Sequence, residues 1–136
     1  MKLYFAYGAN LNLRDMAYRC PNAHPFQSLT LKDWQLAFNG VATVQPKDGA
    51  VVHGALWELT DRCEDSLDIF EGYPYLYNKI YLEQDGMEFM VYVMNDDNPA
   101  PPSRHYLNTI TEGYEHWNLP TEALRKVADQ HLHATY

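Results

Sequence analysis

The first half of the chain is built from short apolar runs separated by turn residues, a pattern that predicts strands. Residues 2–7 are apolar almost throughout and predict a strand buried on both faces. Gly54 interrupts a later apolar run and allows a bulge or the close approach of another backbone. The turn signals Asn39-Gly40 and Lys47-Asp48-Gly49 divide this region, so further strands are predicted at 27–31, 35–38, 41–44 and 50–59.

A helix is predicted in the middle of the chain, where the apolar period changes to that of a helix. Asp61 and Glu64 have the spacing of an N-terminal capping pair, so the helix is expected to begin at Arg62. Gly72 favours a C-terminal cap and ends the helix at Glu71. The apolar face of this helix is expected to consist of Cys63, Leu67 and Phe70.

The second half predicts a hairpin followed by helices. Residues 78–84 and 87–94 flank Asp85-Gly86, the strongest hairpin signal in the chain. Two helices close the chain, near 104–117 and 121–133. Because strands come first and helices last, we expect an α+β fold in one domain spanning 1–136, with a closed or nearly closed sheet.

The composition restricts the classes of partner. A net charge of −8 argues against nucleic acid and anionic membrane surfaces. No apolar run approaches the ~20 residues of a membrane span, and no signal peptide is visible, so a cytoplasmic location is expected. Cys20 and Cys63 are too few for a disulfide framework and are expected to be buried thiols. No spacing of Cys or His predicts a metal site, and no cofactor is expected.

Two stretches carry the candidate chemistry. The stretch at 3–11 runs from a strand into a turn at Gly8, whose backbone N–H groups could bind negative charge developing on an oxygen. The stretch at 67–77 places Glu71 among aromatic residues, which favours a raised pKa and general acid–base chemistry. Alone, the first is more often an ordinary turn and the second more often a solvated carboxylate. A Glu at a helix C-terminus opposes the helix macrodipole, however, which favours a functional reason for Glu71.

Together the two stretches resemble the signatures of the gamma-glutamylcyclotransferase-like family. Leu3-Tyr-Phe-Ala-Tyr-Gly-Ala-Asn-Leu11 is similar to the N-terminal signature, which usually reads Tyr-Gly-Ser-Asn-Leu. Leu67-Asp-x-Phe-Glu-Gly-Tyr-Pro-x-x-Tyr77 is similar to the second signature, whose Glu is the catalytic acid–base. Val52-x-Gly54-x-Leu56, the hairpin at Asp85-Gly86 and Gly113-Tyr114 agree as well, so the resemblance covers nearly the whole chain.

The resemblance implies a small mixed β-barrel flanked by helices, with a cavity at one end. It also implies cleavage of a gamma-glutamyl amide by cyclisation, which releases 5-oxoproline and an amine or amino acid. The nucleophile would be the substrate's own α-amine, so no Ser or Cys nucleophile is needed. A monomer and a homodimer are both open. By the same resemblance Glu71 would be catalytic, Tyr7, Gly8, Ala9 and Asn10 would hold the glutamyl group, and Tyr77 and Tyr114 would line the pocket.

Two departures from the family pattern leave the substrate open. Ala9 replaces the usual Ser and removes a hydroxyl group, and Lys79 stands where many members have Arg. Two alternatives to a gamma-glutamyl cyclotransferase therefore stay open. One is a non-catalytic small-molecule-binding member of the same fold, and the other is an enzyme that cleaves a related aminoacyl amide by the same cyclisation.

Overall fold

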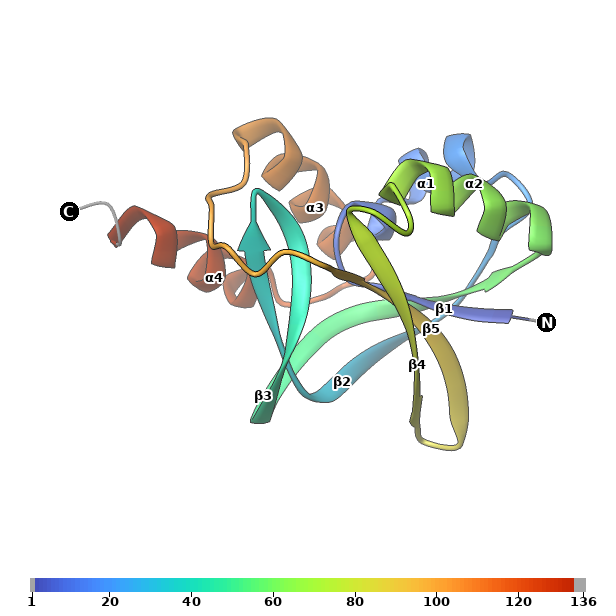
Figure 1. Cartoon of the computed structure of the whole chain (residues 1–136), viewed down its shortest axis with the longest axis horizontal. Coiled ribbons are helices and arrows are strands. Elements are labelled where there is room, and N and C mark those ends of the chain that lie inside the picture. The colour runs from blue at the N-terminus through green and yellow to red at the C-terminus, as the bar shows by residue number, and fades with distance from the viewer. Residues whose placement is uncertain (1, 134–136) are drawn as a thin grey trace.

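Five strands form one mixed sheet in the computed structural model, which describes residues 2–133 and the side chains of residues 2–130 (Figure 1). The strand order is β2-β3-β1-β5-β4. The central strand β1 pairs antiparallel with β3 and parallel with β5. The strands are β1 (Lys2–Ala6), β2 (His24–Asn39), β3 (Val41–Leu59), β4 (Tyr77–Gln84) and β5 (Met87–Met94).

The helices pack beside one another around the strands, and α3 contacts the segment at the start of α1. Figure 1 shows α1 and α2 above β1 on the right of the view, α3 above the middle and α4 on the left. The α+β class, the hairpin of β4 and β5, and the two closing helices are therefore confirmed. Within the described residues, none of the helices is both long and apolar enough to cross a membrane. The helical segments are the 3₁₀ turn η1 (Ala9–Leu11), α1 (Leu13–Arg19), α2 (Asp61–Glu71), α3 (Arg104–His116) and α4 (Thr121–His133).

The sheet is open, so the fold class is confirmed while the word barrel describes the sheet only loosely. Its edge strands are β2 and β4, which share no ladder of backbone hydrogen bonds among the residues described. The Gln84 side chain bridges them: its Oε1 accepts from the Lys32 N–H at 2.9 Å, and its Nε2 donates to the Thr30 carbonyl at 2.9 Å. A carboxamide thus takes the place of the backbone pairing that would close the sheet.

Two long strands replace the four shorter ones expected between residues 27 and 59. Lys32 pairs with Val51 and Trp34 pairs with Pro46, so the register shifts here. Asp33 adopts a positive φ of 68° and accepts from the Gly49 N–H at 3.0 Å. The turn signals at 47–49 therefore build a bulge, because flanking pairs keep both strands running through it. The turn at Asn39-Gly40 is confirmed, since β2 ends and β3 begins there.

Helix α2 begins one residue earlier than expected. Its N-cap is Thr60, whose hydroxyl accepts from the Cys63 N–H at 3.2 Å, so the capping residue is not Asp61. Phe70 is 47% exposed and departs from the buried face expected for it. The C-terminal end is confirmed, because Gly72 caps it in the left-handed conformation with φ of 66°. Glu71 is thereby placed at the last position of the helix.

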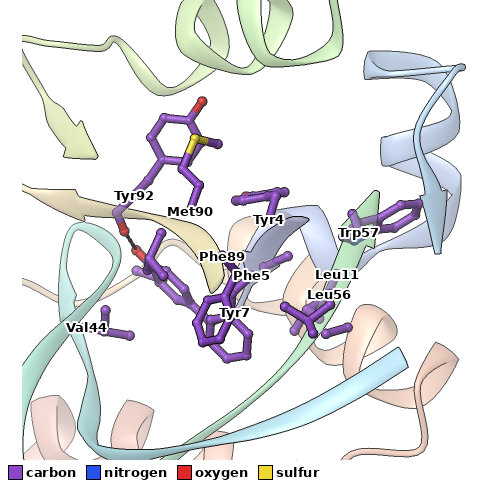
Figure 2. Close-up of a cluster of buried hydrophobic side chains, with 14 of the residues drawn as sticks. Tyr4, Phe5, Tyr7, Leu11, Val44, Leu56, Trp57, Phe89, Met90 and Tyr92 are labelled. Carbon is purple, nitrogen blue, oxygen red and sulfur yellow. Dashed lines mark hydrogen bonds between the residues drawn. The ribbon is translucent and has the colours of Figure 1, made fainter. Parts of the chain in front are cut away.

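The core fixes the end of β1 against β3. The ring of Phe5 lies 6.3 Å from that of Tyr7 and 5.9 Å from that of Phe89, centroid to centroid (Figure 2). A Cβ on Gly54 would lie 2.4 Å from the Ala6 carbonyl oxygen and 2.5 Å from the Phe5 ring. The predicted close backbone approach at Gly54 is therefore confirmed. Both cysteines are buried and free, as expected.

Candidate active site

The turn that follows β1 is packed closely against β3 and α3. A Cβ on Gly8 would lie 3.2 Å from the Ala42 Cβ and 3.4 Å from the Tyr106 hydroxyl oxygen, so a larger residue would press on both. Hydrogen bonding within η1 starts with Leu11, whose N–H donates to the Gly8 carbonyl at 3.0 Å. The N–H groups of Ala9 and Asn10 come before that bond and have no partner inside the turn.

Asn12 anchors the same turn to both neighbouring helices. Its Oδ1 accepts from the N–H groups of Arg14 and Asp15 at 3.1 and 3.2 Å, which caps α1. Its Nδ2 donates to the Thr109 carbonyl of α3 at 3.1 Å. Gly113 allows this packing, because a Cβ there would lie 2.8 Å from the Asn12 nitrogen. These contacts fix the turn against α1 and α3.

Glu71 meets this turn although the two are distant in sequence. Asn10 Nδ2 donates to Glu71 Oε1 at 3.2 Å and to the Tyr4 hydroxyl at 2.9 Å. Burial of the Glu71 carboxyl raises its pKa to about 7, although Arg19 and the Asn10 hydrogen bond favour the charged form. Glu71 can therefore both accept and donate a proton near neutral pH.

Glu71 lines a cavity whose volume, including its open mouth, is about 540 Å³. Three of its tyrosines donate their hydroxyl protons to the protein. Tyr7 donates to the Tyr92 carbonyl at 2.6 Å (Figure 2), Tyr77 to the Ala42 carbonyl at 2.5 Å, and Tyr92 to Asp68 Oδ1 at 2.6 Å. Burial raises the pKa of all three hydroxyls, so they stay neutral.

Two further tyrosines accept hydrogen bonds instead. The Tyr4 hydroxyl accepts from Asn10, and the Tyr106 hydroxyl accepts from the Ala42 N–H at 2.9 Å. Across the part of the chain that the structure describes, neither hydroxyl donates its proton to an acceptor. Tyr4 and Tyr106 can therefore donate to a bound molecule without breaking an existing bond.

The structure brings most of the predicted site residues to one cavity. Tyr114 is the exception: it is buried on α3 and faces a different hollow, beside Gln35 and His53. Tyr106 lines the cavity instead. It lies eight residues before Tyr114 on α3, which places the two side chains roughly 12 Å apart along the helix axis. The expectation that Tyr114 lines the same pocket is wrong. The predicted residues that do line the cavity are Tyr7, Gly8, Ala9, Asn10, Glu71 and Tyr77.

Several lining residues were missed from the sequence. Tyr106 belongs to a stripe at helical spacing that reads equally well as core, and only its place in the first turn of α3 sets it apart. Of the other missed residues, three lie within the two stretches that carry the candidate chemistry, and the rest come from strands that only the tertiary fold brings to the cavity. These other missed residues are Tyr4, Val41, Ala42, Phe70, Leu76 and Tyr92.

Lys79 on β4 contacts α2 and does not line the cavity. Its Nζ contacts Glu64 Oε2 at 2.5 Å and Asp68 Oδ2 at 2.9 Å. Burial opposes the charge on Lys79, but these two carboxylates outweigh it and raise the lysine pKa. In the described residues, no three His, Cys, Asp or Glu side chains are grouped to hold a metal ion.

Comparison with known proteins gives the family. A sequence model described as gamma-glutamyl cyclotransferase, AIG2-like, matches residues 4–118. A gamma-glutamylcyclotransferase of Homo sapiens is 32% identical, and the match covers 92% of this chain and 76% of the relative. Its counterpart in Bos taurus is 30% identical with the same coverage. A solved structure of a gamma-glutamyl cyclotransferase superimposes with a TM-score of 0.81 at 30% identity, covering 93% of this chain and 85% of the other. The resemblance seen in the motifs is thus confirmed, and this chain belongs to the gamma-glutamyl cyclotransferase, AIG2-like family.

Proposed function

We propose that the protein cyclises a gamma-glutamyl amide to 5-oxoproline and releases an amine or amino acid, with Glu71 as the general acid–base. One observation carries the proposal: a carboxyl group with a pKa near 7 lies beside the η1 turn, in the cavity that both motifs line. The names of the relatives support an enzyme of the cyclotransferase class.

The reaction needs one proton acceptor that later becomes a donor. Glu71 takes a proton from the substrate's α-ammonium group, and the freed amine attacks the γ-carbonyl carbon. A ring C–N bond forms, and Glu71 returns the proton to the leaving nitrogen as the original amide C–N bond breaks. The ring nitrogen then gives up its second proton to the Glu71 carboxylate, which passes it to the released amine, so the products are the neutral lactam and a protonated amine. Because nucleophile and carbonyl belong to one molecule, holding the glutamyl chain folded supplies the proximity. A carboxyl group poised near neutral pH contributes on the order of 10²–10⁴-fold.

The oxyanion of the tetrahedral intermediate would be bound by the η1 turn. The N–H groups of Ala9 and Asn10 are free of partners inside the turn, so they can donate to it. Because the backbone supplies these donors, Ala9 can replace Ser without removing them. Tyr7 and Tyr77 would form the walls around the glutamyl chain.

The leaving group distinguishes this proposal from an enzyme that cleaves a related aminoacyl amide. Both reactions use Glu71 in the same way, and they differ in the product. The raised pKa of Glu71 favours either enzyme over a binding protein, since binding alone gains nothing from a carboxyl group poised near neutral pH. The cytoplasmic location and the oligomeric state stay predictions.

The test is product formation from a panel of gamma-glutamyl dipeptides, gamma-glutamylamines and glutathione, with products identified by mass spectrometry. We expect 5-oxoproline from at least one compound. Glu71→Gln should lower kcat by at least ~10²-fold while the dissociation constant stays within a few-fold. Glu115→Gln, an exposed change on α3, is the control and should keep full activity. Turnover by Glu71→Gln at the wild-type rate would remove Glu71 from the role.

A further inference from the structure

Arg19 contacts the site without lining its cavity. It is the last residue of α1, and its guanidinium lies 3.5 Å from the centroid of the Phe70 ring, next to Glu71. Its Nη1 also donates to Asn10 Oδ1. The guanidinium therefore joins the end of α1 to the end of α2 and to the η1 turn.

The Asn10 side chain is almost fully buried, at 2% exposed, and uses both ends of its carboxamide. The oxygen end faces Arg19, and the nitrogen end faces Tyr4 and Glu71. A carboxamide can turn over and exchange these ends. In the exchanged orientation its NH₂ would face the guanidinium, donor against donor, and its oxygen would face the carboxylate, acceptor against acceptor.

Of the three groups around this carboxamide, only Arg19 has a fixed polarity. Tyr4 can donate or accept through its hydroxyl group. Glu71 accepts as a carboxylate but can also donate once it has taken a proton. The guanidinium donates at every pH at which the protein functions. In the step where Glu71 is protonated, Arg19 is thus the one contact that opposes reversal of the Asn10 amide.

We propose that Arg19 is a positioning residue, which keeps the Asn10 carboxamide in the orientation that donates to Glu71 throughout the proton transfer. The role assigned to Glu71 in catalysis rests on the proposed function. The geometry of the Arg19–Asn10–Glu71 chain does not, so the two claims can fail separately.

Arg19 is also the charged group that acts on Glu71 from the neighbouring elements. It lowers the pKa of Glu71 against the larger, opposite effect of burial. The other titratable groups around the carboxyl are tyrosines whose pKa values are raised by burial, which keeps them neutral near pH 7. They are Tyr4 on β1, Tyr7 after it, Tyr77 on β4, Tyr92 on β5 and Tyr106 on α3.

The test compares Arg19→Met with Arg14→Met by NMR titration of the Glu71 carboxyl carbon. Arg14 is the matched control, because it lies on the same helix and pairs with the exposed Glu112 instead. We expect Arg19→Met to raise the pKa of Glu71 and to broaden or double the Asn10 side-chain NH₂ signals. Arg19→Lys keeps the charge and a donor and should restore most of the wild-type titration. Arg14→Met should leave both signals unchanged.

Kinetics on the best substrate of the panel form the second readout. For Arg19→Met we expect kcat at pH 7 to fall about tenfold, with the acid limb of the pH–rate profile moved to higher pH and KM changed little. Asn10 side-chain NH₂ signals that stay as in the wild type in a folded Arg19→Met variant overturn the positioning role, whatever its activity, because the loss of charge alone would also move the Glu71 titration. Should that variant not fold, the Arg19→Lys protein decides. Wild-type Asn10 NH₂ signals together with retained activity support the role, and reversed or averaged signals together with wild-type activity overturn it. A wild-type protein inactive on every compound refutes the proposed function, while the NMR titration still decides the role of Arg19.

Discussion

The tyrosine hydroxyls around the cavity divide into two kinds at the scale of single residues. Tyr77 and Tyr106 show the difference at one point of the backbone, because both bond to Ala42. Tyr77 donates its proton to the Ala42 carbonyl, whereas Tyr106 accepts from the Ala42 N–H and keeps its own proton. Both bonds fix β3 at the cavity, but only Tyr106 retains a donor for a ligand.

We predict that Tyr77→Phe and Tyr106→Phe each lower the free energy of unfolding by about 1–3 kcal/mol, since each leaves a group of buried Ala42 unpaired. Only Tyr106→Phe should also raise KM, by about five- to tenfold. Urea unfolding and steady-state kinetics measure the two effects. Tyr81→Phe, which alters a 62% exposed tyrosine on β4, is the control for both. Equal KM values in the two cavity variants would contradict the division.

At the scale of elements, three of the five acidic residues of α2 lie at helical spacing in different surroundings: Glu64, Asp68 and Glu71. Glu64 bonds Lys2 and Lys79, and Asp68 bonds Lys79 and Tyr92. These contacts tie α2 to β1, β4 and β5. Glu71 follows at the end of the same helix, receives no lysine, and contacts Asn10. The first two residues therefore position the helix, and the third is left with the raised pKa that acid–base chemistry requires.

Lys79→Met should loosen this attachment. The Lys79 side chain is 11% exposed, so its loss removes a positive charge from beside the largely buried carboxylates of Glu64 and Asp68. We expect the free energy of unfolding to fall by about 2–3 kcal/mol, because Lys2 and Tyr92 still serve the two carboxylates. The value of kcat should fall several-fold as the end of α2 shifts. Lys79→Arg keeps the charge and should preserve both quantities, which urea unfolding and steady-state kinetics measure. A Lys79→Met protein of wild-type stability would show that Lys79 does not hold α2 in place.

Local signals explain which elements could be predicted. Gly72 after Glu71 and Gly86 in the hairpin act through their own backbone conformation, so their positions were readable from the sequence. The glycine at 49 gave a similar signal but sits in a bulge, because strand pairs on both sides override it. Arg19 and Tyr106 could not be assigned to the site, since α1 and α3 reach the cavity only through tertiary packing.

At the scale of the whole molecule, the raised pKa of Glu71 opposes stability. Its pKa rises from 4.5 in an exposed chain to about 7 in the fold, so between these values the folded protein binds more protons than the unfolded one. Stability from this group is therefore complete below pH 4.5 and decreases as the pH rises toward 7. Above pH 7 the folded state carries a cost of up to about 3 kcal/mol, which is the free energy needed to hold a buried carboxylate.

Glu71→Gln should remove this cost, because glutamine has nearly the same shape, can accept from Asn10 and does not ionise. We predict that the variant is more stable than the wild type by about 1–3 kcal/mol at pH 8 and that the difference vanishes near pH 4.5. Urea unfolding across this pH range measures it, with Glu115→Gln as the exposed control. An inactive variant that gains stability only at high pH would show that the carboxyl group needed for turnover is the one that costs the fold free energy. A constant difference between the two proteins from pH 4.5 to 8 would instead mean that Glu71 titrates alike in the folded and unfolded chains.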